Sequence, residues 1–200
     1  MWEHLKKNPK LLFLGSFVGA IAVIIVVVAV MHARDQNRIA NLAKLFTDWQ
    51  TVAGKISRFE ARMPGQPEYA SQDLPLADPG QTMRQEMYVG GDTHMSYFVS
   101  ATQYPSEVTG DEEQNLRASL GGMVNAISGG KIISSSYHVP FSGANYLEFE
   151  AYGTGNGNSA SYKGRILLDA QSLYEAYVTY PKDSYSDAAY TYFVNSFSPQ

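Results

Sequence analysis

The sequence of 200 residues predicts an α+β fold, an antiparallel β-sheet flanked by helices, preceded by one N-terminal transmembrane helix. Three observations lead to this prediction. Residues 11–31 contain no charged side chain, later segments alternate apolar and polar residues in short runs, and two amphipathic segments interrupt and end these runs. Strands joined by short turns pair antiparallel, and helices placed between and after them cover the faces of the sheet.

The uncharged run 11–31 is the predicted transmembrane helix, and residues 1–10 form its cytoplasmic tail. A rise of ~1.5 Å per residue lets the run span roughly 31 Å, about the thickness of a bilayer core. A cleaved signal peptide is the alternative, but its apolar region extends over only about 7–15 residues. More basic side chains precede the run than closely follow it. This bias predicts a single-pass protein of the bacterial inner membrane, with its C-terminal domain in the periplasm.

The predicted span has one group of small side chains that favours the close approach of a second helix. This candidate helix-packing face consists of Gly15, Ser16, Gly19 and Ala20. The ordinary glycine content of membrane helices explains the same residues, so both interpretations stay open. His4 and His32 flank the span, and the sequence leaves open whether either contacts a pigment or haem.

Residues 32–53 are predicted to form a helical linker outside the membrane. Their apolar side chains recur at a spacing of three and four residues, which is typical of one helix face. This stripe consists of Ile39, Leu42, Phe46 and Trp49. It packs either on the following domain, residues 54–200, or on a partner.

Short alternating runs predict the first strands of this domain. The run 56–63 alternates apolar and polar residues and ends at Pro64. The segment 68–80 contains several turn signals, including prolines, and is predicted to be a loop. Strands at 82–89 and 93–103 are joined by Gly-Gly-Asp, which is typical of a hairpin.

The clearest helix of the domain is predicted at 111–128. Acidic residues at its start suit the helix dipole, its apolar residues fall on one face, and Gly129 ends it. Four more strands are predicted at 131–138, 145–152, 161–169 and 172–180. A last helix is predicted at 184–196.

The composition excludes several function classes. The net charge is −4, 44% of the residues are hydrophobic and 17% are charged. A chain with this balance is neither disordered nor a basic nucleic-acid binder, so no nucleic-acid partner is predicted. The absence of cysteine excludes disulfides, thiolate metal sites, a cysteine nucleophile and a lipid-modified cysteine.

No arrangement of residues predicts catalysis, and we assign no catalytic, cofactor-binding or metal-binding residue. The four histidines lack the spacing of a zinc site, although His94 and His138 lie on predicted strands and could meet across the sheet. Glu148 and Glu150 share one strand face. Paired acids can hydrolyse glycosides or bind a cation, but they also occur simply because a strand face is solvated. We therefore expect a protein that is not an enzyme.

Tyrosine is unusually frequent, with 14 residues, and it is concentrated in the last quarter of the chain. Tyrosine has an apolar body and a polar tip, which suits interfaces, and it is also favoured in strands. Packing within the sheet and a contact surface therefore both explain it. The candidate partner surface consists of Trp49, Tyr177, Tyr185 and Tyr190.

Several segments resemble the PsbP-like family. The segment Phe-Glu-Ala-Arg-Met-Pro-Gly-Gln-Pro at 59–67 is similar to the first strand of the family and the turn that follows it. Gly-Arg-Ile at 164–166, Leu-Tyr-Glu-Ala-Tyr-Val at 173–178 and Phe-Val-Asn-Ser-Phe at 193–197 are similar to its closing strands and helix. The helix predicted at 111–128 lies where the family has one.

The resemblance covers roughly residues 52–198 and implies an antiparallel sheet sandwiched by helices. It also implies a non-enzymatic role, because the best-known members are extrinsic subunits of photosystem II and bacterial relatives are anchored extracytoplasmic proteins. The uncleaved N-terminal helix departs from the lipidated cysteine or transit peptide of the family. No metal-binding residue of the family has a match here, so the resemblance implies no role in oxygen evolution.

These observations predict a non-catalytic accessory or structural subunit of a larger membrane complex, an energy-transducing one of photosynthesis or respiration. Its partners would be the bilayer, other integral subunits that contact the span, and proteins that bind the external domain. The alternative is a membrane-tethered binding module for a small apolar ligand or lipid. That alternative requires an apolar pocket between the sheet and a helix.

Overall fold

A computed structural model gives the fold and describes residues 45–76, 81–141, 143–155, 158–181 and 183–200. The secondary-structure elements of these residues follow one another in this order: β1 (Gln50–Ala53), β2 (Phe59–Met63), β3 (Glu68–Pro75), β4 (Thr82–Gly91), β5 (Ser96–Gln103), α3 (Glu112–Asn125), β6 (Ser128–His138), β7 (Tyr146–Gly155), β8 (Asn158–Asp169), β9 (Ser172–Tyr180), α4 (Asp187–Ser196) and β10 (Ser198–Pro199).

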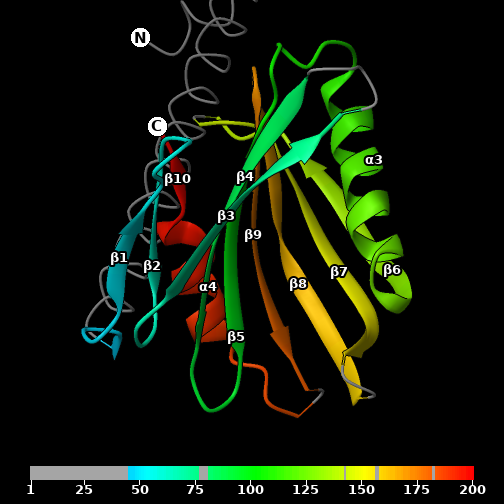
Figure 1. Cartoon of the computed structure of the whole chain (residues 1–200). Helices are drawn as coiled ribbons and strands as arrows, with labels where there is room; N and C mark the ends of the chain where they lie inside the picture. The colour runs from blue at the N-terminus through cyan, green and yellow to red at the C-terminus, as the bar shows by residue number, and fades with distance from the viewer. Residues whose placement is uncertain (1–44, 77–80, 142, 156–157, 182) are drawn as a thin grey trace, which may run out of the picture. The chain divides into compact units, whose positions relative to one another are not determined.

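A seven-stranded antiparallel sheet forms the centre of the domain (Figure 1). Its strand order is β3-β4-β5-β9-β8-β7-β6, so β9 returns to pair with β5 after the chain has built the other half of the sheet. The neighbouring strands β5, β9 and β8 are therefore central, and β3 and β6 are the two edges. A central strand contacts other layers on both faces, which explains why β9 is apolar or aromatic at most positions.

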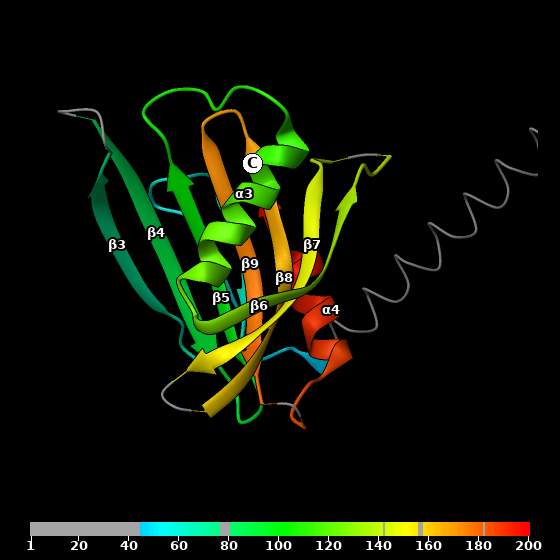
Figure 2. The same cartoon turned by 90° about the vertical axis from the view of Figure 1, so that its right-hand side faces the viewer.

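Helix α3 covers one part of one face of the large sheet, over β6, β7 and β8 (Figure 2). Asp111 caps its N-terminus, because the Asp111 side chain accepts a hydrogen bond from the backbone N–H of Gln114 at 2.7 Å. Three residues of its buried stripe face the sheet: Leu116, Leu120 and Val124. They join a core cluster with residues of β7, β8 and β9 that includes Leu147, Phe149, Ile166 and Leu173.

The opposite face of the large sheet is covered by α4 and by a small three-stranded sheet of order β1-β2-β10. Aromatic rings fill the space between these layers. The ring of Tyr97 on β5 lies 5.0 Å from Trp49 and 5.3 Å from Phe193 of α4, both in edge-to-face arrangements. Such pairs are favourable beyond the area they bury. This face of the sheet is therefore a closed aromatic core.

Glu86 on β4 fixes the small sheet to the large one. Its side chain is fully buried, with 0% exposure. The carboxylate accepts hydrogen bonds from the backbone N–H groups of Lys55, Ile56 and Ser57 at 2.8, 3.0 and 2.7 Å. These residues form the loop between β1 and β2, so one buried charge holds this loop against β4.

The predicted fold class is wrong, because it assigns helices a larger part of the fold than they have. Among the described residues, strands account for 53% and helices for 17%, so the sheet dominates the fold. The prediction of a helix-flanked α+β fold assumed that helices cover the faces of the sheet. Instead α3 covers only part of one face, and α4 shares the other face with a second sheet.

The part of the chain that the structure describes contains no helix long and apolar enough to cross a membrane. The predicted tail 1–10 and span 11–31 lie outside the described residues. So do residues of interest in and beside them: His4, Gly15, Ser16, Gly19, Ala20 and His32. The predicted transmembrane, single-pass location in the bacterial inner membrane, with a periplasmic domain, is not supported by the structure, nor is a link to photosynthesis.

Two strands lie in segments for which the sequence predicts a helix or a loop. Strand β1 lies in the predicted helical linker 32–53, and β3 lies in the predicted loop 68–80. The edge strand β3 is exposed along most of its length, so it lacks the buried face that produces an alternating pattern. Strand β1 pairs with β2, and the compact unit of the domain begins at Phe46, before the predicted boundary.

The substitution Glu86→Gln is expected to lower the free energy of unfolding by about 2–4 kcal/mol, because it removes the charge that three backbone donors share and turns an N–H group toward one of them. Urea denaturation at pH 7 measures this loss. Glu68→Gln, at an exposed position on β3, is the matched control and is expected to change stability by less than about 0.5 kcal/mol. Equal effects of the two substitutions would show that Glu86 does not hold the two sheets together.

Candidate functional site

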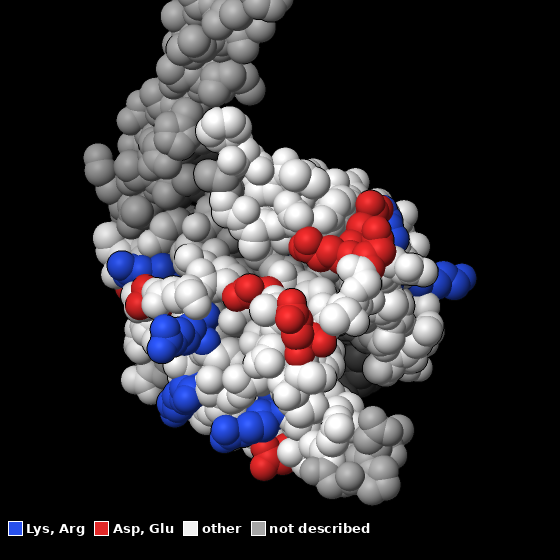
Figure 3. Space-filling view, turned by 90° about the horizontal axis from the view of Figure 1, so that it is seen from above, with Lys and Arg blue, Asp and Glu red and all other residues white. Residues whose placement is uncertain are grey.

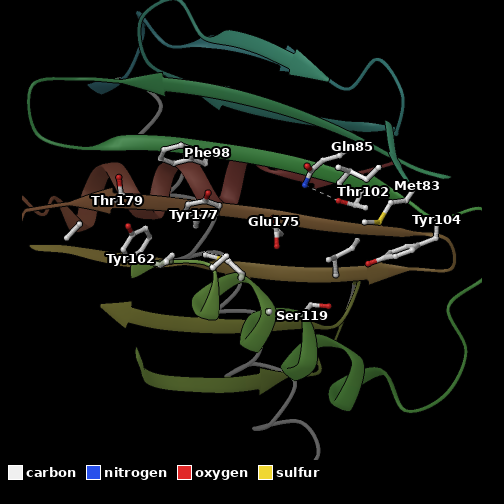
Figure 4. A pocket seen from close by; sticks show the side chains of 17 residues that line it. Met83, Gln85, Phe98, Thr102, Tyr104, Ser119, Tyr162, Glu175, Tyr177 and Thr179 are labelled. Carbon is white, nitrogen blue, oxygen red and sulfur yellow. Dashed lines mark hydrogen bonds between the residues drawn. The ribbon is translucent and has the colours of Figure 1, made fainter. Parts of the chain in front are cut away.

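A groove of about 910 Å³ lies between α3 and the part of the large sheet that α3 leaves uncovered (Figure 4). Its lining comes from β3, β4, β5, β8, β9 and α3, and from residues just after β5 and α3. Apolar and aromatic side chains predominate, among them Met83, Phe98, Met123, Tyr162 and Tyr177. Gln85, Thr102, Ser119 and Glu175 add polar groups. Ligand-binding pockets typically occupy about 300–1,000 Å³ and combine an apolar lining with a few polar groups.

A glycine of α3 leaves part of the groove free of side chains. Gly121 and Gly122 are adjacent in the middle of α3, and a methyl group added at either would meet no atom within 4 Å. Of the two, Gly122 lines the groove. A glycine inside a helix costs about 1 kcal/mol relative to alanine. The empty space beside Gly122 is thus kept open at a cost in helix stability.

Glu175 provides the one charged side chain among the residues that line the groove. It stands on β9 directly opposite Ser100 of β5 and Ile166 of β8. The hydroxyl of Ser100 donates a hydrogen bond to Oε2 of Glu175 at 2.7 Å. Burial raises the pKa of the Glu175 carboxyl above its usual range, and the hydrogen bond from Ser100 opposes this rise.

Aromatic rings surround Glu175 along the groove. The rings of Phe98 on β5 and Tyr177 on β9 are stacked, with centroids 4.8 Å apart and planes inclined by 5°. Figure 4 shows Tyr177 and Tyr162 on one side of Glu175 and Tyr104 on the other. Burial raises the pKa of the Tyr177 hydroxyl, and the nearby Glu175 carboxylate raises it further. Burial followed by Glu175 raises the pKa of Tyr104 in the same way. These tyrosines are therefore neutral donors at physiological pH.

Gly164 on β8 makes room for the stacked pair. A methyl group added at Gly164 would lie 2.3 Å from Cβ of Tyr177, its neighbour across the strands. Any larger residue at this position would push Tyr177 out of place. The lack of a side chain at Gly164 thus lets the Tyr177 ring occupy its place in the groove.

The charged side chains on the face that Figure 3 shows do not cover a continuous area. Most of the described surface there is uncharged, basic side chains lie mainly along its left and lower edge, and acidic ones lie mainly toward its centre and right. Extended polyanion sites require a continuous basic surface. On this face, basic side chains form no such surface.

The four residues of the candidate partner surface lie in three different environments. Tyr177 lines the groove. Trp49 is only 6% exposed and packs in the aromatic core against Tyr97 and Tyr192. Tyr185 and Tyr190 lie 6.1 Å apart on the opposite face of the sheet from the groove, where Tyr190 is buried. These residues therefore do not form one surface.

The paired acids Glu148 and Glu150 lie on this opposite face and already have partners. The carboxylate of Glu148 accepts a hydrogen bond from Tyr190 at 3.1 Å and lies 3.6 Å from Arg165 and 3.8 Å from His138. Glu150 pairs with Lys163 at 2.9 Å. The contacts of Glu148 and Glu150 with neighbouring basic side chains have a structural explanation.

His94 and His138 do not meet across the sheet. His94 lies in the turn between β4 and β5, where Asp92 accepts a hydrogen bond from its backbone N–H at 2.7 Å. His138 ends β6 and stacks on Tyr146 at 4.7 Å. Strands β9, β8 and β7 separate β5 from β6, which explains the separation.

Glu175, Ser100 and Gly122 are not among the candidate residues that the sequence predicts. A signal for Glu175 is present, because a carboxylate occurs in the middle of the apolar and aromatic segment 172–180. No local signal marks Ser100 as its partner, because the pairing of β5 with β9 joins segments far apart in the sequence. Gly122 appears in the sequence only as a weak position in a helix.

Comparisons with known proteins leave the function open. No protein family model matches the chain, and no curated protein matches it in sequence. Among solved structures, PA94 of Pseudomonas aeruginosa, a protein of unknown function, is 8% identical with a TM-score of 0.35, over 68% of this chain and 85% of that one. LpqN of Mycobacterium tuberculosis, which is involved in cell envelope biogenesis, is 13% identical with a TM-score of 0.41, over 76% of this chain and 78% of that one.

A third solved structure, of a protein from Bacteroides thetaiotaomicron VPI-5482, is 13% identical with a TM-score of 0.41. The similarity covers 71% of this chain but only 45% of that one, so this chain spans less than half of that protein. Identity and TM-score are too low in all three comparisons to support an argument about function. The resemblance to the PsbP-like family therefore stays a prediction.

The substitution Glu175→Gln is expected to raise the melting temperature at pH 7. Because the pKa of Glu175 is raised in the folded protein, folding is favoured while the carboxyl is protonated, and this contribution is lost as the pH rises through the folded-state pKa. The advantage of the variant should therefore shrink as the pH falls toward about 4.3, the usual pKa of glutamate.

Thermal unfolding of wild type and variant between pH 4 and pH 8 measures this difference. Glu107→Gln, at an exposed loop position, is the control and should show no such pH-dependent gain. A Glu175→Gln variant that is less stable than wild type at pH 7 would show that the ionised carboxylate does not destabilise the folded protein.

Proposed function

We propose that this protein is a binding module for a small ligand with an apolar body, held in the groove between α3 and the large sheet. The observation that carries the proposal is the groove of about 910 Å³ with its mainly apolar and aromatic lining. Burial of apolar surface contributes about 25 cal/mol per Å² of buried area, so such a lining favours an apolar ligand.

Two further features support ligand binding at this place. The lining residues stand mostly on β-strands with antiparallel partners on both sides, so the site is largely preformed. The polar groups of Gln85, Thr102, Ser119 and Glu175 are distributed along the groove, where they can orient a ligand. The groove also matches the requirement of the alternative function predicted from the sequence, an apolar site between sheet and helix.

The substitution Gly122→Leu is expected to weaken binding of the neutral fluorescent probe N-phenyl-1-naphthylamine at least about tenfold, because a leucine side chain would fill the groove. Fluorescence titration of the purified protein measures this affinity. The matched control is Gly121→Leu, at the adjacent position of α3, which also has free space but does not line the groove.

Both leucine variants are expected to raise stability by roughly 0.5–1 kcal/mol, because each removes a glycine from a helix. They therefore differ in binding but not in folding. Equal probe affinity of wild type and Gly122→Leu, or no affinity in any of the three proteins, would contradict ligand binding in the groove.

A second candidate function is that of an accessory subunit of a larger assembly. Apolar side chains on and after the edge strand β6 favour it, since Ile133 is 64%, Val139 73% and Phe141 106% exposed. Exposed apolar residues grouped at a sheet edge are typical of protein contacts.

The double variant Ile133→Ser and Phe141→Ser tests this second function. If these residues contact a partner protein, the variant should lose proteins that co-purify with the tagged wild type, whereas Gly122→Leu should retain them. Quantitative mass spectrometry of the purified material measures both. Identical sets of co-purifying proteins in the wild type and the double variant would contradict a contact at β6.

A further inference from the structure

The lining of the groove carries only negative charge. Glu175 is acidic, and none of the residues that line the groove is lysine, arginine or histidine. The basic residues nearest in the sheet, Lys163 and Arg165 on β8, belong to the opposite face, where they pair with Glu150 and Glu148. The alternation of side chains along β8 keeps these cations away from the groove. Glu175 is therefore a carboxylate in an apolar site without a cation from the lining.

The carboxyl group of Glu175 has capacity for a further hydrogen-bond donor. Within the described residues its side chain forms one hydrogen bond, from Ser100 to Oε2. Oε1 accepts no hydrogen bond from the described residues, although an ionised carboxylate accepts several. Oε1 is not among the fully buried unpaired atoms, so it is open to a donor on a ligand in the groove.

The other groups that face Glu175 do not offset its charge. Tyr177 on β9, Tyr162 on β8 and Tyr104 after β5 are the titratable neighbours in the groove. The pKa values of Tyr177 and Tyr104 are raised by burial and by Glu175, so these two hydroxyls are neutral at pH 7. From α3 and β4, the lining residues such as Ser119, Met123 and Gln85 carry no charge. The faces of aromatic rings attract cations, and these rings lie to both sides of Glu175 along the groove (Figure 4).

We propose that the groove selects organic cations, that is, ligands with a protonated amine or other ammonium group on an apolar body, and that Glu175 is their counter-ion. This inference rests on the proposed binding of apolar ligands in the groove. The apolar body would occupy the space beside Gly122 and Phe98, and the nitrogen would donate a hydrogen bond to Glu175 within the aromatic surround. The same desolvation that disfavours the free carboxylate strengthens its pairing with a bound cation.

Three probes with one apolar body and different head groups test the proposal: 4-phenylbutylamine, 4-phenylbutanol and 4-phenylbutyrate. The full-length protein at pH 7 is titrated with each by isothermal calorimetry. We expect the amine to bind at least about tenfold more tightly than the alcohol, as a charge-assisted hydrogen bond implies, and the carboxylate to bind more weakly than the alcohol. Glu175→Gln should remove the preference for the amine over the alcohol.

The outcomes separate this inference from the proposed function. Equal affinity for amine and alcohol in the wild type, or a preference for the amine that persists in Glu175→Gln, overturns the role of Glu175 but leaves the groove as an apolar site. A preference for 4-phenylbutyrate overturns the selectivity for cations. Failure of all three probes to bind, with no effect of Gly122→Leu on N-phenyl-1-naphthylamine, overturns the proposed function and this inference with it.

Discussion

The buried carboxylate of Glu86 is the interaction on which the layered arrangement of this domain depends. Without it, the loop between β1 and β2 would leave three backbone N–H groups without partners against an apolar sheet. With it, the small sheet is held over β4, and the aromatic rings of Trp49, Tyr97 and Phe193 close one face of the large sheet. The groove that we propose as a binding site lies on the other face, where α3 covers only one part.

The carboxylates on the two faces of the large sheet differ in their partners. On the closed face, Glu86 is satisfied by backbone donors, while Glu148 and Glu150 are satisfied by basic side chains. In the groove, Glu175 has one hydroxyl donor and no cation among the lining residues. A half-buried carboxylate without a basic partner in an apolar groove is a feature that functional sites often have.

Much of the strand pattern could be predicted from the sequence, because the central strands have a buried face that demands apolar residues at alternate positions. Strands β4, β5, β8 and β9 fall close to the predicted ranges for this reason. The sequence did not predict the edge strand β3, because neither of its faces is buried. It did not predict β1, because Trp49 just before this strand continues a helical spacing. The site could not be predicted, because Ser100 and Glu175 meet only through the long-range pairing of β5 with β9.

Gly122 leaves bare helix backbone in one wall of the groove, and this has a consequence for dynamics. Helix α3 is held to the sheet by Leu116, Leu120 and Val124, while Gly121 and Gly122 lower its helix propensity. Opening of α3 at this point would leave the ladder of the sheet intact, because the strands pair with one another. Amide hydrogens in the middle of α3 should therefore exchange faster than those of β8 and β9, and the helix rather than a loop would control entry to the groove.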